Sequence, residues 1–120
     1  MKTLYCDKNE LTALDLTKCT ELRDLDCGNN KLKELDVSQC ARLEYLFCRY
    51  IGLTMLDVSQ CVDLKRLYCN NNNLTTLDVT KCTELSVLNC SNNKLTTLDI
   101  RQCSKLDGLY CDENVQVVRE

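Results

Sequence analysis

The apolar positions of this chain recur with a period of 21 residues. Three columns of leucine and one of mixed aliphatic residues keep this period without an insertion. They are Leu4, Leu25, Leu46, Leu67, Leu88 and Leu109; Leu11, Leu32, Leu53, Leu74 and Leu95; Leu14, Leu35, Leu56, Leu77 and Leu98; and Leu16, Val37, Val58, Val79 and Ile100. Because one repeat cannot bury its apolar face alone, so regular a period predicts a solenoid of stacked coils.

Each repeat contains two short apolar stretches. In the first, apolar residues alternate with others, as in Leu-x-Cys, which predicts a short strand with one buried face. The second stretch, Leu-Asp-aliphatic, lies in a return arm of about ten residues, too short for a helix and two bends. We therefore predict a mainly β, right-handed solenoid with little or no helix: a parallel sheet on one face and extended rungs or short strands on the other.

The whole chain, residues 1–120, reads as one domain of five repeats and a partial sixth. The ending NVQVVRE leaves the register, and we expect residues 112–120 to serve as a C-terminal cap. Met1 falls in the column of Leu22, and an unpaired strand edge over residues 1–16 would favour end-to-end self-association. The start, MKTLYCDKNE, has no apolar core of signal-peptide length.

The repeat unit can be written LxxLxCxxNxLxxLDVSxCxx. Its first half resembles the leucine-rich repeat, LxxLxLxxNxL, with cysteine in the third apolar place. The nested 21-residue form is similar to the bacterial IRREKO subclass and to the LDVS-containing repeats of Bacteroidetes surface proteins. This resemblance implies a ligand-binding or adhesive scaffold at a bacterial surface or in a secreted protein.

A column of asparagines follows the predicted strands. Its members are Asn9, Asn30, Asn72, Asn93 and Asn114. A short amide pointing inward at a bend can satisfy backbone groups of its own and the adjoining coil, so we interpret the column as a structural ladder. Ile51 interrupts it, which costs hydrogen bonds but adds apolar burial of similar size.

Eleven cysteines form two further columns with the same period. They are Cys6, Cys27, Cys48, Cys69, Cys90 and Cys111, and Cys19, Cys40, Cys61, Cys82 and Cys103. A column of parallel side chains suits neither disulfide geometry nor a tetrahedral zinc site, so we predict buried free thiols that act as small hydrophobes. Zinc, an iron–sulfur centre and an adventitious disulfide remain as alternatives. Free thiols fit a reducing compartment.

Charge and composition narrow the function classes. The net charge is −3 without a basic stripe, which argues against nucleic acid and membrane surfaces as partners. The chain has no histidine, phosphate loop or nucleophile elbow, so we predict no enzyme activity and no cofactor. The column Asp15, Asp36, Asp57, Asp78 and Asp99 reads as a row of local turns, with calcium binding as the alternative.

Every aromatic residue lies on or beside the outward side of the predicted sheet. Aromatics and arginines are densest in the third and fourth repeats, at Tyr45, Phe47, Arg49, Tyr50, Arg66 and Tyr68. Tyrosine and arginine are enriched at binding hot spots, so these six residues form a candidate surface for a protein or glycan ligand. Two other interpretations stay open. In one, the aromatic residues serve only to stabilise the strands. In the other, the array is purely structural or engineered, with no ligand.

Overall fold

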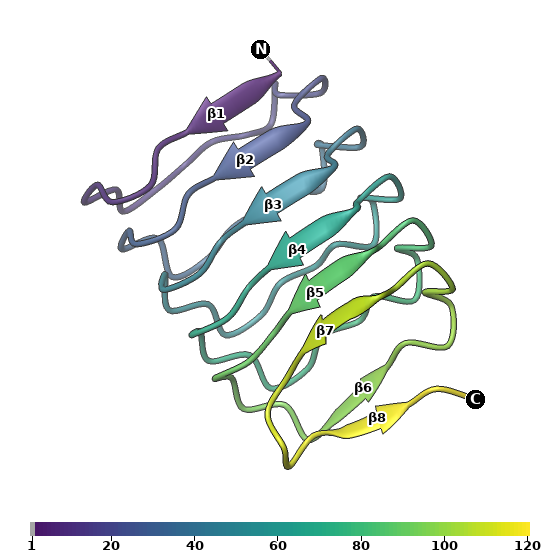
Figure 1. The fold of residues 1–120 in the computed structure, drawn as a ribbon. Helices are drawn as coiled ribbons and strands as arrows, with labels where there is room; N and C mark the ends of the chain where they lie inside the picture. The colour runs from purple at the N-terminus through teal and green to yellow at the C-terminus, as the bar shows by residue number, and fades with distance from the viewer. Residues whose placement is uncertain (1) are drawn as a thin grey trace.

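The computed structural model describes residues 2–120, which form a solenoid of stacked coils (Figure 1). Six three-residue strands make one parallel sheet, in the order β1-β2-β3-β4-β5-β7. They are β1 (Thr3–Tyr5), β2 (Asp24–Asp26), β3 (Tyr45–Phe47), β4 (Arg66–Tyr68), β5 (Val87–Asn89) and β7 (Gly108–Tyr110). Each central leucine pairs with the leucine 21 residues later, beginning with Leu4 and Leu25. The predicted parallel sheet is confirmed, and none of residues 2–120 is helical.

The leucine columns fill the interior of the coils. In the second to fifth coils the central strand leucines Leu25, Leu46, Leu67 and Leu88 are fully buried. The equivalent leucines of the outer coils, Leu4 and Leu109, are only partly buried, because a neighbour covers them on one side alone. Burial therefore comes from stacking, as the period predicts.

The return arm is extended but pairs as a strand at one place only. β6 (Thr97–Asp99) pairs in parallel with β8 (Gln116–Val118), and together they form a second, two-stranded sheet. The arm ends in two successive turns that meet at a cysteine: in the third coil Cys61 N donates to Val58 O, and Leu64 N donates to Cys61 O. The extended rung expected from the short return arm is thus confirmed.

The last coil is two residues shorter than the others. Leu98 pairs with Val117, a separation of 19 residues, whereas the strands of the large sheet pair at a separation of 21. A tight turn, in which Val115 N donates to Asp112 O, takes up the difference. Asn114 is exposed there and makes no side-chain hydrogen bond within residues 2–120, so its prediction as a ladder member was wrong. The predicted position of Met1 lies outside the described residues.

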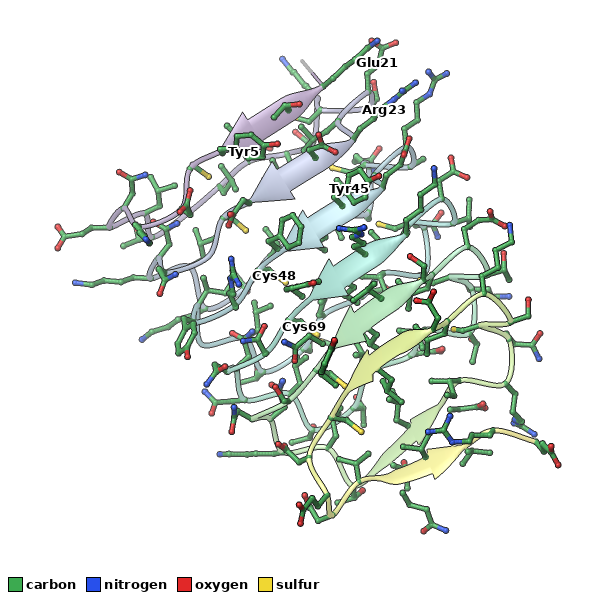
Figure 2. The ribbon with its side chains drawn as sticks, viewed as in Figure 1. Tyr5, Glu21, Arg23, Tyr45, Cys48 and Cys69 are labelled. Atoms are coloured by element: carbon green, nitrogen blue, oxygen red, sulfur yellow. The ribbon has the colours of Figure 1, made fainter. Side chains whose placement is uncertain are left out.

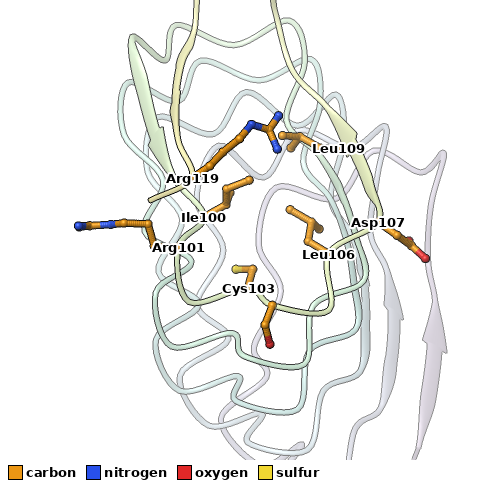
Figure 3. Close-up of a pocket in the computed structure, with 8 residues that line it drawn as sticks. Ile100, Arg101, Cys103, Leu106, Asp107, Leu109 and Arg119 are labelled. Carbon is orange, nitrogen blue, oxygen red and sulfur yellow. The ribbon is translucent and has the colours of Figure 1, made fainter.

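A hollow opens at the C-terminal end of the solenoid (Figure 3). Ile100, Cys103 and Leu106 point into it, whereas the side chain of Asp107 points away. Ile100 and Cys103 are nevertheless buried, at 8% and 5% exposed, and Leu106 is partly buried. Within the same residues, no helix has the length and apolarity that a membrane crossing needs.

Candidate binding surface

The structure places five of the six predicted surface residues in two neighbouring groups, Phe47 with Tyr68 and Arg49, and Tyr45 with Arg66. β3 supplies Tyr45 and Phe47, and β4 places Arg66 and Tyr68 beside them in register. Phe47 meets Tyr68 edge-on, with ring centroids 5.0 Å apart and an interplanar angle of 81°. The Arg66 guanidinium lies 5.9 Å from the centroid of the Tyr45 ring. Since residues alternate across a strand, all four side chains share the outward face, from which Tyr5 and Tyr45 project in Figure 2.

Arg49 extends this surface along the chain after β3. Its guanidinium lies 5.9 Å from the centroid of the Tyr68 ring, so Tyr68 contacts both Phe47 and Arg49. The stem of Arg49 runs over Gly28, where an added Cβ would come within 3.0 Å of Arg49 O and 3.3 Å of Arg49 Cγ. A larger residue than glycine at position 28 would therefore displace Arg49.

Tyr50, the sixth predicted residue, lies in the turn beyond the strand and is 53% exposed. Its φ of 58° is in the left-handed region. This conformation belongs to the turn itself, because the equivalent residues Lys8, Asn29, Asn71 and Asn92 share it. Asparagine tolerates the left-handed region, whereas a bulky side chain there is an outlier. The hydrogen bond from Tyr50 N to Asn70 O is also long, at 3.4 Å against 3.0 Å for Asn71 N to Ser91 O.

The asparagine ladder is present on both sides of the interruption at Ile51. Asn72 Nδ2 donates to Cys48 O and Cys69 O, and its Oδ1 accepts from Leu53 N. Asn30 and Asn93 repeat this arrangement with their own coil and the preceding one. Asn9 bonds only within its own coil, to Cys6 O and Asp7 O.

Ile51 changes the backbone of this turn as well as the ladder. In other coils a backbone amide of this turn donates to the preceding coil: Lys31 N donates to Leu11 O, and Asn73 N donates to Leu53 O. In the third coil the direction is reversed, because Lys33 N of the preceding coil donates to Ile51 O. Gly52 and Lys33 adopt positive φ, of 76° and 62°, to form it. The isoleucine side chain is 2% exposed, so the turn has been rebuilt around a buried apolar residue.

Two acidic residues next to the aromatic surface were not among the predicted site residues. Asp24 and Asp26, on β2, pair in register with Tyr45 and Phe47. Asp26 Oδ1 accepts from Gly28 N, whereas Asp24 Oδ1 is buried without a hydrogen-bond partner. The sequence contained the signal for both residues, since they stand in the same columns as Tyr45 and Phe47.

The thiols are free, and eight of the eleven are buried. Burial raises the pKa of Cys27 and Cys61 to about 12, with smaller contributions from neighbouring thiols and Asp26 or Asp57. At the opposite bend, Cys61 Sγ lies 3.8 Å from Val37 O and Cys82 Sγ lies 3.8 Å from Val58 O. Cys61, Cys82 and Cys103 of this second column each donate to a carbonyl 24 residues earlier, as Asn72 does at its own bend. They form a ladder of buried free thiols, as predicted.

The aspartate column of the return arm forms local turns. Asp57 Oδ1 accepts from Ser59 N, and Asp78 Oδ1 accepts from both Thr80 N and Thr80 Oγ1. Hydrogen bonds from Ser59 lower the pKa of Asp57, and those from Thr80 lower the pKa of Asp78. Within residues 2–120, no group of three or more cysteines and carboxylates is placed to hold a metal ion.

The sequence and the coordinates are similar to known repeat proteins. Residues 1–39 match the family described as Leucine Rich repeats (2 copies), and residues 84–108 match Leucine Rich Repeat. No curated protein is significantly similar in sequence to this chain.

Solved structures cover almost the entire chain. Internalin C2 from Listeria monocytogenes is 22% identical, with a TM-score of 0.84, over 98% of this chain and 54% of its own. TLR13 in its complex with ssRNA13 is 22% identical, with a TM-score of 0.77, over 98% of this chain and 21% of its own. The functional domain of InlJ from Listeria monocytogenes, described as including a cysteine ladder, is 30% identical over 99% of this chain and 44% of its own, with a TM-score of 0.40.

This chain therefore spans about a fifth to a half of the length of these three proteins. The first two structures share its fold, and the matched families describe its repeat. The chain is built of leucine-rich repeats and forms a leucine-rich-repeat solenoid with an internal cysteine ladder.

Proposed function

We propose that this chain is a non-catalytic binding module for a protein ligand, and that the ligand contacts Tyr45, Phe47, Arg49, Tyr50, Arg66 and Tyr68. The supporting observation is that five of these side chains form two interacting groups side by side on the outward face of the parallel sheet. Hot spots of protein interfaces are enriched in tyrosine and arginine and are clustered in this way. The 21-residue nested repeat supports placement in the bacterial IRREKO-type or LDVS-containing subclass.

The aromatic residues do not form the uniform ladder that a purely stabilising role would favour. Their column on the sheet reads Tyr5, Asp26, Phe47, Tyr68, Asn89 and Tyr110. The strand leucines behind them are identical in every repeat, so variation within these strands is confined to the outward positions. Constant buried residues that support variable exposed residues are suited to binding.

A protein ligand fits the shape of this surface better than a small glycan does. The hollows that stand out on the molecule lie elsewhere: at the end of the last coil, around Glu44 and Lys65, and along the return arm. Small ligands favour concave sites, whereas a flat face suits a macromolecular partner. The TLR13 structure holds single-stranded RNA, but Asp24 and Asp26 make the adjoining surface of this chain unfavourable for a polyanion.

Binding to an array of proteins and glycans tests the proposal. We expect at least one protein ligand whose binding is lost when Tyr45→Ala and Phe47→Ala are combined. Met55→Ala is the matched control, because Met55 is 73% exposed on the return arm and far from the sheet face in the repeat. A ligand that binds the double variant as tightly as the unchanged chain would contradict the proposal, as would binding to glycans alone.

A further inference from the structure

Charged residues flank the aromatic surface in two bands of opposite sign. Asp24 and Asp26 lie on β2, one strand before Tyr45 and Phe47. Arg66 lies on β4, one strand after Tyr45 and Phe47. The Arg49 guanidinium lies near the ring of Tyr68, which is also on β4. Adjacent strands are about 4.8 Å apart, so β2 and β4 are separated by roughly 10 Å. Across three adjacent strands, the row Asp24, Tyr45 and Arg66 thus runs from acidic through aromatic to basic.

These four charges have no ionic partner within residues 2–120. The ion pairs of that part of the chain lie at the bends and the return arm instead: Glu44 contacts Arg23 and Lys65, Glu84 contacts Lys105, and Asp99 contacts Arg101. Some charges at the bends and the return arm are therefore neutralised by the chain itself, whereas these four on the sheet face are available to another molecule.

Asp24 carries a second sign of an external partner. Its Oδ1 is buried and accepts no hydrogen bond, and its Oδ2 has only the 3.5 Å contact with Thr3 Oγ1. A desolvated carboxylate oxygen without a donor is unfavourable, and an external basic side chain that pairs with the Asp24 charge would offset part of that cost.

We propose that the ligand is a protein segment of mixed charge. It presents a basic side chain to Asp24 and Asp26, an apolar side chain to Tyr45 and Phe47, and an acidic side chain to Arg49 and Arg66. This inference rests on the proposed function and adds the chemistry of the partner. Opposite bands reject uniformly charged partners of either sign, because one band would always meet a like charge.

Selection from a random displayed library of 12-residue peptides tests the inference. We expect the unchanged chain to enrich peptides that contain a basic and an acidic residue on either side of an apolar one. The paired variant Asp24→Asn with Asp26→Asn should no longer select the basic residue, and Arg49→Gln with Arg66→Gln should no longer select the acidic one. Each pair should weaken a selected peptide on the order of tenfold or more. Asparagine at position 26 retains the oxygen that accepts from Gly28 N.

The outcomes separate this inference from the proposed function. If the selected peptides depend on Tyr45 and Phe47 but bind both charge variants unchanged, the surface binds protein and the mixed-charge inference is wrong. Peptides of a single charge sign would also overturn it. If the combined Tyr45→Ala and Phe47→Ala variant selects the same peptides, or if no peptide is enriched, both the inference and the proposed function fail.

Discussion

At the scale of single residues, the third repeat departs from its neighbours in the turn after the strand, where the backbone adopts left-handed φ values. Tyr50 holds a left-handed conformation that asparagine occupies in three other coils. Ile51 replaces the asparagine that would have bonded two coils, and Gly52 and Lys33 take positive φ around it. Strained residues of this kind persist where the surrounding structure holds them, and they often cluster at functional sites. Both substitutions lie beside the aromatic surface.

Replacing Tyr50 by asparagine should stabilise the fold. Relief of the left-handed strain is expected to raise the free energy of unfolding by about 1 kcal/mol. Denaturant unfolding measures this change. The reverse substitution Asn92→Tyr, at the equivalent exposed position, serves as the control and should lower stability by a similar amount. A Tyr50→Asn protein less stable than the original would show that the tyrosine contributes to the scaffold.

Restoring the ladder with Ile51→Asn should also raise stability. The new amide could accept from Leu32 N, as Asn72 accepts from Leu53 N, and could donate to Cys48 O. This gain opposes the loss of a buried isoleucine, so the net increase should be small. The reciprocal change Asn72→Ile should cost about 1–3 kcal/mol, because it leaves buried backbone groups unpaired. If Ile51→Asn destabilises the protein, apolar burial in the rebuilt turn outweighs the missing hydrogen bonds.

At the scale of elements, each coil is closed by polar or thiol side chains at its bends. Asn72 satisfies the bend after the strand, and Cys61 and Cys82 occupy the bend after the return arm. The aspartate turns keep their carboxylates ionised, and burial keeps the thiols neutral. The aspartate turns and the cysteine bends therefore depend on protonation state, which links the stability of the stacked coils to pH.

Stability should fall at both ends of the pH range. Burial raises the pKa of Cys27, Cys82 and Cys90 from 9.0 to about 12. Between these values the unfolded chain loses thiol protons that the folded chain keeps, so stability present below pH 9 is lost as pH rises. Each such thiol contributes a slope of about 1.36 kcal/mol per pH unit. The combined variant Cys61→Ala and Cys82→Ala should reduce the slope.

The loss of stability at low pH has the opposite cause. Turn hydrogen bonds lower the pKa of Asp36, Asp57 and Asp78 from 3.8, so their contribution is present above pH 4 and is lost as pH falls further. Urea unfolding at a series of pH values measures the free energy of unfolding at both the acid and the alkaline end. Constant stability from pH 9 to pH 11 would contradict the buried-thiol account.

Most of the fold was predictable because the columns of Leu25, Asn30 and Cys40 keep one period. A period fixes which residues stack, and stacking fixes the sheet register. The ending NVQVVRE signalled a change of register, but its effect on the ladder could not be foreseen. Asn114 keeps its place in the 21-residue period, whereas the last coil is two residues shorter and leaves it outside the ladder. The rebuilt turn at Gly52 and the unpaired oxygen of Asp24 depend on backbone and packing geometry that the periodic sequence pattern does not show.

At the scale of the whole molecule, a protein of these 120 residues should associate end to end at high concentration. Leu106 and Leu109 are only partly buried beside a hollow at one end, and Leu4 and Leu11 are only partly buried at the other. Apolar surface and an unpaired strand edge favour self-association. Sedimentation across a concentration series measures it. A strict monomer at the highest concentration would contradict this expectation.

The central claim is that the inward columns hold the fold and that the outward aromatic surface serves binding. The free energies of unfolding of Tyr45→Ala, Phe47→Ala and Leu46→Ala, three neighbours on β3, test it most directly. Leu46 is fully buried, and its removal should cost about 2–5 kcal/mol. Replacing either outward aromatic residue by alanine should lower the free energy of unfolding by under about 1 kcal/mol, because its side chain is partly exposed. If Tyr45→Ala and Phe47→Ala unfold the protein as readily as Leu46→Ala, the aromatic residues belong to the scaffold, and the division of roles is wrong.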